Sequence, residues 1–375
     1  MTRLGGSPLV VAGLLLVGGS FAVAPTAARG STDQVWSAFV LVAGLILVGL
    51  VADEDGLFAW VGHRLAALAP GAVPLFIGSS ALVAVVTAVL NLDTSVLFVT
   101  PVLVYAARSR AMAPGPLLTT SILVANAGSL LLPGSNLTNL IVLGHLHRSG
   151  GAFAARMALP LVGSLVVTTV VIAVVERASL RAAGPRGPEP GRPTIGLGVV
   201  AVGVAAVCVL VLRNAALPVA AVGLVAVAVR LAQHREQADR VRGVLGLPVL
   251  VALFGLAVAL GTLGRSWAGP ATLLGHLGAP GTTAFAALAS VVVNNLPAAS
   301  LLAARTPPHP YALLIGLDIG PNLFVTGSLA WVLWWRTARS TGERPPRWRA
   351  VVIGAVSAPV AMAVAVALLG VTART

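Results

Sequence analysis

Long runs of hydrophobic residues alternate with short polar stretches from one end of the chain to the other. Many of these runs reach about 17–25 residues, the length that a helix needs to cross a hydrocarbon core about 30 Å thick. The pattern therefore predicts an all-helical protein that crosses a membrane many times. We expect about nine full spans, at 8–25, 35–52, 116–144, 157–175, 195–212, 215–231, 245–263, 311–335 and 350–370.

Two further hydrophobic segments, 72–107 and 282–305, have a polar break in the middle and are predicted to be hairpins. The order of span, short segment, hairpin, broken span and final span occurs twice, which predicts two repeats of inverted orientation, as in many secondary transporters. The chain then divides into an N-terminal span (1–30), a first transport repeat (31–175), connecting loops with two linking spans (176–244) and a second, inverted repeat (245–375).

Composition supports the membrane interpretation. Hydrophobic residues make up 57% of the chain and charged residues 9%, against roughly 25% charged residues in soluble domains. The net charge of +13 comes from arginines spread over short loops, without the basic face that nucleic-acid binding requires. Most of these arginines fall on one side of the predicted topology, which places the N-terminus on the inner, cytoplasmic side of the cell membrane. We expect residues 1–25 to be a retained span, although they also resemble a signal peptide.

Four polar stretches interrupt hydrophobic segments, and such breaks are typical of transport sites. Non-helical backbone is tolerated at membrane depth only where it is buried in protein or lines a water-filled cavity. Freed backbone groups and the ends of half-helices then become ligands for ions or polar solutes. A structural kink is the competing interpretation for any single break. The four stretches are NLDTS (91–95), PGSNLTN (133–139), VVNNLPAAS (292–300) and DIGPNLFVTGS (318–328).

Two carboxylates, Asp93 and Asp318, fall inside the predicted membrane segments. An acidic residue at the centre of a membrane helix costs roughly 2.5–3.5 kcal/mol on insertion scales, so it is a candidate for function. We predict both as proton-coupling groups, with Asp93 as the first choice and helix capping as the alternative role for Asp318. No metal motif, nucleophile elbow or cofactor motif is recognisable, so neither an enzyme nor a bound cofactor is expected.

Uncharged polar side chains in the same stretches are the predicted ligands of the substrate, which we expect to be a small inorganic oxyacid or anion. These candidate ligands are Asn91, Thr94, Ser135, Asn136, Asn139, Asn294, Asn295, Thr326 and Ser328. The helix breaks themselves are predicted at Pro133, Gly134, Pro297, Gly320 and Pro321.

At these stretches the sequence resembles the arsenical pump membrane protein family, within the ion transporter superfamily that also includes citrate carriers and sodium/proton antiporters. The matching segments are YALLIGLDIGPNLFVTGSLAWVLWW (311–335), DEDGLFAWVGHRLAAL (53–68), LLPGSNLTNLIV (131–142) and SVVVNNLPAAS (290–300). Two positions depart from the family pattern, because Leu92 replaces an asparagine and Asn126 stands where the family often has aspartate.

The resemblance implies export of arsenite or antimonite coupled to proton entry. It also implies a cytoplasmic ATPase subunit as a candidate partner, and a second copy of the chain is another candidate. A carboxylate carrier similar to citrate carriers, or a sodium/proton exchanger of the same superfamily, is the alternative. Arsenous acid is largely uncharged at neutral pH and presents hydroxyl groups, which asparagine and serine can bind. The single cysteine, Cys208, excludes a cluster of thiolates as the arsenite ligand.

Overall fold

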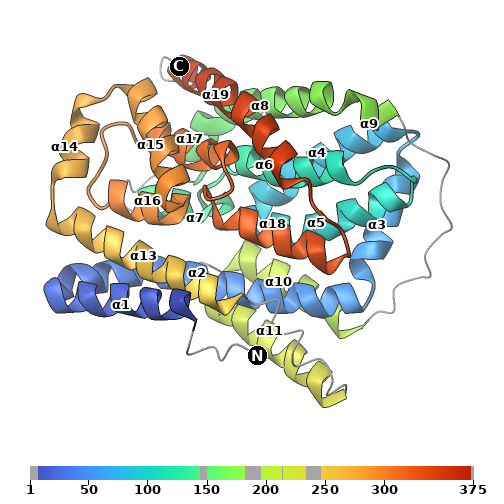
Figure 1. The fold of residues 1–375 in the computed structure, drawn as a ribbon, viewed down its shortest axis with the longest axis horizontal. Coiled ribbons are helices and arrows are strands. Elements are labelled where there is room, and N and C mark those ends of the chain that lie inside the picture. The colour runs from blue at the N-terminus through green and yellow to red at the C-terminus, as the bar shows by residue number, and fades with distance from the viewer. Residues whose placement is uncertain (1–6, 144–149, 182–195, 213, 234–245, 373–375) are drawn as a thin grey trace.

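The computed structural model describes residues 7–143, 150–181, 196–212, 214–233 and 246–372, and every regular element in these ranges is a helix (Figure 1). The first part of the chain forms α1 (Pro8–Val23), α2 (Pro25–Glu54), α3 (Leu57–Leu68), α4 (Ala72–Val89), α5 (Leu92–Arg108), α6 (Gly115–Gly128), the 3-10 turn η2 (Pro133–Ser135), α7 (Leu137–Leu143), α8 (Gly150–Val175) and α9 (Arg177–Arg181). The second part forms α10 (Leu197–Val211), α11 (Ala216–Gln233), α13 (Leu247–Ser266), α14 (Gly269–His276), α15 (Ala279–Val293), α16 (Asn295–Leu302), α17 (Pro310–Ile319), η4 (Gly320–Leu323), α18 (Leu329–Ser340) and α19 (Arg347–Thr372).

Within these ranges, 6 helices are long and apolar enough to cross a membrane: α2, α4, α8, α11, α13 and α19. The structure thus confirms an all-helical protein with many membrane helices, although fewer single helices are of full length than the nine expected. The predicted spans 8–25 and 195–212 form the shorter helices α1 and α10, with 16 and 15 residues. The predicted spans 116–144 and 311–335 are each divided by a 3-10 turn.

Helix α2 differs most from its predicted span. It begins at Pro25 rather than at residue 35 and runs for 30 residues, because a proline in the first turn costs no hydrogen bond and favours helix initiation. At 1.5 Å per residue it is about 45 Å long, longer than the hydrocarbon core. The predicted boundary between an N-terminal unit and the first repeat, at residue 30, therefore falls inside a continuous helix.

The order of elements occurs twice. Helices α2 and α3, the hairpin α4–α5, the broken helix α6–η2–α7 and the long helix α8 correspond in sequence to α13, α14, the hairpin α15–α16, the broken helix α17–η4–α18 and α19. Opposite orientation of the two sets across the membrane stays a prediction. The predicted connecting loops 176–194 and 232–244 lie largely outside the described residues.

Long helices flank the hairpins and the broken helices. Along the lower edge of Figure 1, α1 packs on α13, and α2 packs on α13, α10 and α11. Near the end of α2, Asp55 accepts a hydrogen bond from the backbone amide of Gly198, 2.6 Å away, and is ion-paired with Arg230. The α10–α11 pair is therefore held to the end of α2 by a buried carboxylate.

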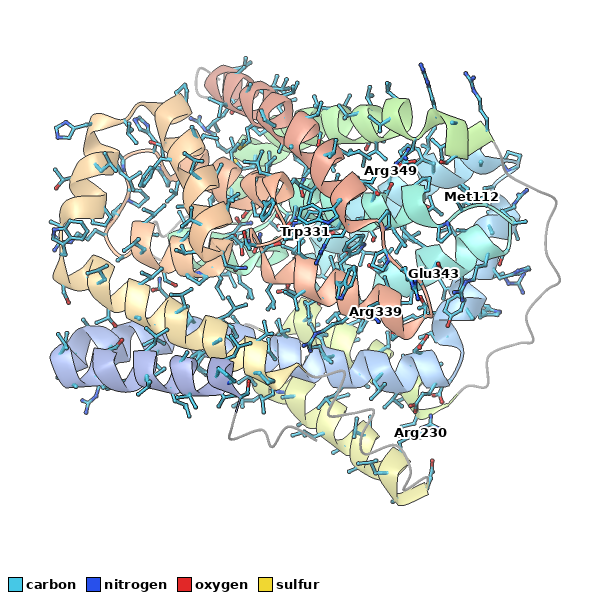
Figure 2. All side chains as sticks on the ribbon, viewed as in Figure 1. Met112, Arg230, Trp331, Arg339, Glu343 and Arg349 are labelled. Carbon is cyan, nitrogen blue, oxygen red and sulfur yellow. The ribbon has the colours of Figure 1, made fainter. Side chains whose placement is uncertain are left out.

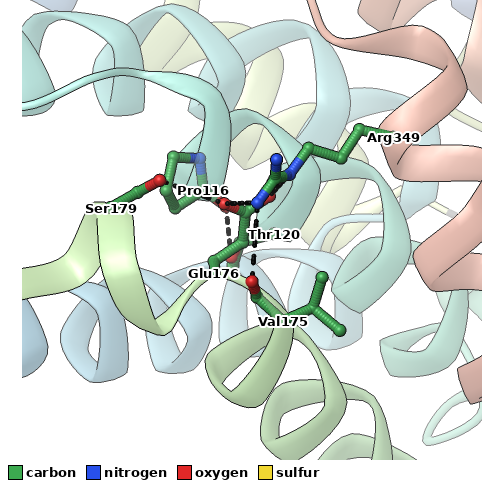
Figure 3. A network of polar contacts seen from close by, with 6 residues as sticks. All are labelled: Pro116, Thr120, Val175, Glu176, Ser179 and Arg349. Carbon is green, nitrogen blue, oxygen red and sulfur yellow. Dashed lines mark hydrogen bonds and ion pairs between the residues drawn. The ribbon is translucent and has the colours of Figure 1, made fainter.

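On the opposite edge, the last helices of the two repeats, α8 and α19, pack along each other (Figure 1). Figure 3 shows the contact at one end, where the buried Glu176 carboxylate is paired with Arg349 at 2.5 Å and accepts a hydrogen bond from Ser179. At the other end, Arg156 donates to the carbonyl of Thr372 over 2.7 Å. Polar contacts at both ends therefore fix the two helices relative to each other.

Arginine side chains gather at the end of the molecule where α5 and α18 finish and α19 begins. Figure 2 labels Arg339, Glu343 and Arg349 in this region, and Arg108 is paired with Glu343 at 2.6 Å. Arg347 also lies over the rings of Trp335 and Trp348. We call this region the arginine-rich end; the positive-inside rule predicts that it faces the cytoplasm.

Candidate transport site

The first hairpin turns at Asn91, which caps helix α5. The Asn91 side-chain oxygen accepts a hydrogen bond from the backbone amide of Thr94 at 2.7 Å, as N-terminal caps do. Asp93 follows in the first turn of α5 and is 8% exposed. Within the described residues, neither the Asp93 carboxylate nor the Thr94 hydroxyl has a hydrogen-bond partner in the protein. The first tip therefore holds polar groups that are available to a proton, an ion or a substrate.

The first break, η2, is held together by its own side chains. Ser135 contacts the carbonyl of Ser129 at 2.5 Å, and the Asn139 amide donates to the carbonyls of Ser129 and Leu132 at 2.8 and 3.1 Å. These bonds satisfy carbonyl groups that the end of α6 leaves open, which is the requirement for a break inside a membrane. Pro133 and Gly134, two of the predicted break residues, lie in η2.

Asp318 joins the two broken helices. It is fully buried near the end of α17, and one carboxylate oxygen accepts bonds from the Asn136 amide at 3.0 Å and the Thr138 hydroxyl at 2.6 Å. The other oxygen is buried without a hydrogen-bond partner among the described residues. Asp318 lies just before the break and bonds the opposite repeat, so its observed contacts are not those of a helix cap. Thr138 was not among the predicted ligands, although it belongs to the same SNLTN stretch.

A second link between the repeats runs through Asn126 and Asn322. The Asn126 amide donates to the Asn322 side-chain oxygen at 2.9 Å, and the Asn322 amide donates to the carbonyl of Leu123 at 2.9 Å. Ser328 donates to the Asn126 side-chain oxygen at 3.4 Å. Asn322 is not among the predicted ligands, because its sequence context, GPNLF, indicates only a helix break.

The second hairpin turns at Asn294, which has a left-handed backbone angle φ of 75°. Its side-chain amide donates to the carbonyl of Thr326 at 3.0 Å, and the backbone amide of Asn295 donates to the carbonyl of Gly327 at 2.8 Å. The Thr326 side chain is exposed and donates to the carbonyl of Val291 at 2.5 Å. The second tip is thus bonded to residues 326–327, the segment that connects η4 with α18.

The predicted breaks in the second repeat also have identifiable positions. Gly320 and Pro321 are the first two residues of η4. Gly320 packs so closely on Ala287 of α15 that a side chain would not fit. Pro297 lies in the first turn of α16, where proline is compatible with the helix. The chain therefore breaks at Asn294, before Pro297.

The predicted ligands do not form one cluster. Asp318 meets Asn136, Asn126 meets Ser328, and Asn294 meets Thr326, whereas no described hydrogen bond joins Asp93 to any of these groups. Within the described ranges, no group of three or more His, Cys, Asp or Glu residues could hold a metal ion. The candidate site is therefore a set of uncharged polar contacts between the repeats, with two buried carboxylates.

A cavity of about 580 Å³ lies beside this region, between α2, α3, α5 and α18. It is lined by Leu97 and Pro101 of α5 at one side and by Arg336 and Arg339 of α18 at the arginine-rich end.

Comparison with known proteins identifies a matching family model, described as "CitMHS: Citrate transporter", over residues 6–333. A protein of Bacillus subtilis (strain 168) named "Putative arsenical pump membrane protein" is 27% identical over 160 residues, 42% of this chain and 36% of that protein. The match thus spans little more than a third of the relative's length. The crystal structure of the Alcanivorax borkumensis YdaH transporter, described as having an unusual topology, aligns with a TM-score of 0.49 and 15% identity, covering 92% of this chain and 87% of the other.

Proposed function

The chain belongs to the CitMHS citrate transporter family, and we propose that this membrane transporter exports arsenite or antimonite across the cell membrane in exchange for protons. The observation that carries the proton coupling is Asp93, a buried carboxylate at a hairpin tip without a hydrogen-bond partner among the described residues. A carboxylate in a membrane helix is a functional candidate by default. Without a fixed partner, its proton can be exchanged with the solvent or with a substrate.

The arsenite assignment is supported by the relative named as an arsenical pump and by the chemistry of the polar residues between the repeats. Arsenous acid is largely uncharged at neutral pH and carries hydroxyl groups that both donate and accept hydrogen bonds. Asn136, Thr138 and Asp318 offer complementary groups in a region closed to solvent. The lone Cys208 cannot supply a set of thiolate ligands for arsenic.

A second candidate cargo is a small carboxylate. The description of the family as citrate transporters favours it, and so do Arg336 and Arg339 in the lining of the cavity. Guanidinium groups bind carboxylates through paired hydrogen bonds. In this candidate the coupling through Asp93 is unchanged, and only the cargo differs.

Arsenite accumulation in cells that lack their own efflux pump tests the proposal. We expect lower accumulation when this protein is present, and we expect the difference to vanish when a protonophore collapses the proton gradient. The Asp93→Asn protein, quantified in the membrane fraction, is the matched control and is expected to leave accumulation high. Unchanged arsenite accumulation with the natural chain in the membrane would reject arsenite as cargo. Carboxylate flux, with and without sodium, is then the assay for the second candidate.

The proposed orientation places the N-terminus and the arginine-rich end in the cytoplasm. A reporter fused after Arg349 is expected to read as cytoplasmic, and an external reading would overturn the inverted topology. An ATPase subunit or a second copy of the chain would be detected by co-purification from the membrane at native expression level.

A further inference from the structure

The cavity beside α5 runs along two facing helices, α2 and α18. Its lining residues on α2, Ile46, Gly49, Leu50 and Asp53, follow helical spacing along one face of that helix. On the facing helix, α18, the lining runs from Val332 toward Ser340. The cavity is therefore an elongated space that begins at the arginine-rich end and extends along α2 and α18 into the molecule.

The deep end of the cavity leads toward Asp93. Leu97 and Pro101 line the cavity, and they follow Asp93 at positions i+4 and i+8 of α5, so that all three residues share one face of the helix. Leu97 lies about 6 Å along the helix axis from Asp93, at about 1.5 Å per residue. The buried carboxylate is thus about one helical turn beyond the floor of the cavity.

The end of the cavity at the arginine-rich end of the molecule carries positive charge. Arg336 and Arg339 lie one turn apart on α18, and Arg339 lies over the ring of Trp335 at 5.5 Å. The guanidinium of Arg336 occupies the space next to Gly246, which has a positive φ of 58° and no side chain to displace it. Asp53 is the one carboxylate among the lining residues, and it accepts a bond from the Tyr105 hydroxyl at 3.3 Å.

We propose that this cavity is an entrance vestibule that binds a small oxyanion, such as a carboxylate or an inorganic oxyanion, at Arg336 and Arg339 before the ion moves toward Asp93. Guanidinium groups recognise oxyanions through their planar set of donors, and walls of low dielectric constant concentrate the positive potential. The hydroxyl groups of Thr337 and Ser340 in the lining add neutral donors. An uncharged solute such as arsenous acid would gain nothing from this potential.

The inference rests on the proposed function only in taking the chain as a transporter. It deepens the second candidate cargo, and its test measures chemical labelling rather than transport. A failed arsenite assay therefore leaves it standing, and a failed labelling assay leaves proton-coupled arsenite export standing.

Site-directed labelling measures the charge preference of the vestibule directly. In a Cys208→Ser background, Val332→Cys places a thiol in the cavity, one turn deeper on α18 than Arg336. The purified full-length protein in detergent is treated with methanethiosulfonate reagents that carry either a sulfonate or a trimethylammonium group. We expect the anionic reagent to react faster than the cationic one relative to their rates with a free thiol. Arg336→Gln combined with Arg339→Gln should lower this ratio about tenfold.

Arg344→Gln is the matched control, because Arg344 is an exposed arginine in the segment between α18 and α19 and does not line the cavity. It is expected to leave the ratio unchanged. Leu97→Cys, on α5, provides a second thiol if the Val332→Cys protein does not fold. A ratio that the double substitution does not change, or a lack of reaction at both positions, would overturn the proposal.

Protection identifies the class of anion. Citrate that slows labelling while phosphate does not would assign the vestibule to carboxylates, and the reverse would assign it to inorganic oxyanions. The Arg336→Gln/Arg339→Gln protein should lose either protection. If neither anion slows the reaction at millimolar concentration, the vestibule does not bind oxyanions.

Discussion

The two hairpin tips have similar sequences, NLD and NNLP, but the structure uses them differently. The first tip caps its own helix through Asn91, and it leaves the Asp93 carboxylate without a hydrogen-bond partner among the described residues. The second tip also caps its helix, through the Asn294 side-chain oxygen and the backbone amide of Leu296. In addition it is bonded to another segment, because Asn294 and Asn295 bond the carbonyls of Thr326 and Gly327. The first tip therefore presents the Asp93 carboxylate, whereas the second tip is held in place by hydrogen bonds to residues 326–327.

This difference assigns separate tasks to the two hairpins. A proton carrier must change its charge during each cycle, and fixed partners for one charge state would oppose that change. Asn294 and Asn295 instead satisfy carbonyl groups at membrane depth, where an open carbonyl costs several kcal/mol. We infer that the first tip carries the chemistry of coupling and that the second tip fixes the position of α18 beside the vestibule.

Asp93→Asn is expected to have the largest effect, a loss of gradient-driven transport of at least a hundredfold, since proton-coupled transport loses its carrier. Asparagine has nearly the same volume, so the protein should reach the membrane in normal amount. Flux in proteoliposomes with an imposed proton gradient measures the effect. Near-normal gradient-driven flux in the variant would remove Asp93 as the carrier and with it the division of tasks between the tips.

The contact between the broken helices is expected to have the next largest effect. Asn136→Ala removes one of the two donors to the buried Asp318 carboxylate, and a buried group that loses a partner costs about 1–3 kcal/mol. We expect apparent substrate affinity to fall about tenfold, measured as the concentration for half-maximal flux. Asn139→Ala is the matched control, because Asn139 bonds only backbone carbonyls within its own break and a serine. An equal loss of affinity in both variants would mean that the effect arises from the break and not from Asp318.

Much of this architecture was accessible from the sequence because membrane burial imposes strong patterns. The hairpins, both broken helices and the repeated order of elements followed from the length of hydrophobic runs and from polar residues inside them. The start of α2 was placed about ten residues too late, because the polar residues of STDQ (31–34) lowered the hydrophobicity of a segment that is helical and partly buried. A run of hydrophobic residues indicates the part of a helix that contacts lipid. Helix α2 extends beyond that run, and it also packs on the helices α13 and α11.

The candidate site was harder to predict, because partner choice depends on how the two repeats pack. The sequence singled out Asp318 and Asn136 as separate candidates, and only the fold brings them within 3.0 Å. Asn322 was missed for the same reason, since its partner Asn126 is far away in the sequence. Ser135 and Asn139 were predicted as substrate ligands, but most of their observed bonds go to the backbone of the break, which a sequence pattern cannot distinguish from ligand binding.

Stability measurements can distinguish the anchored tip from the free one. Asn294→Ala removes the bond to Thr326 and places alanine at a φ of 75°, which costs of order 1–3 kcal/mol for a residue other than glycine. We expect a lower thermal midpoint for the detergent-purified protein. Asn294→Gly loses the same bond, but glycine adopts a positive φ without strain. The Asn294→Gly protein should therefore be clearly more stable than the Asn294→Ala protein. Equal midpoints for the two variants would show that the backbone conformation at the second tip contributes nothing.

Asn91→Ser is expected to have the smallest effect, and it tests whether Asn91 is a cap or a ligand. Serine caps helices about as well as asparagine does, so the bond to the amide of Thr94 should persist and the thermal midpoint should stay nearly unchanged. Asn91→Ala removes the cap and should cost about 1 kcal/mol. If Asn91 only caps α5, both variants keep the natural apparent affinity for the cargo. A large loss of affinity in Asn91→Ser, with normal stability, would show that the side-chain amide touches the cargo, and the first tip would then bind substrate as well as protons.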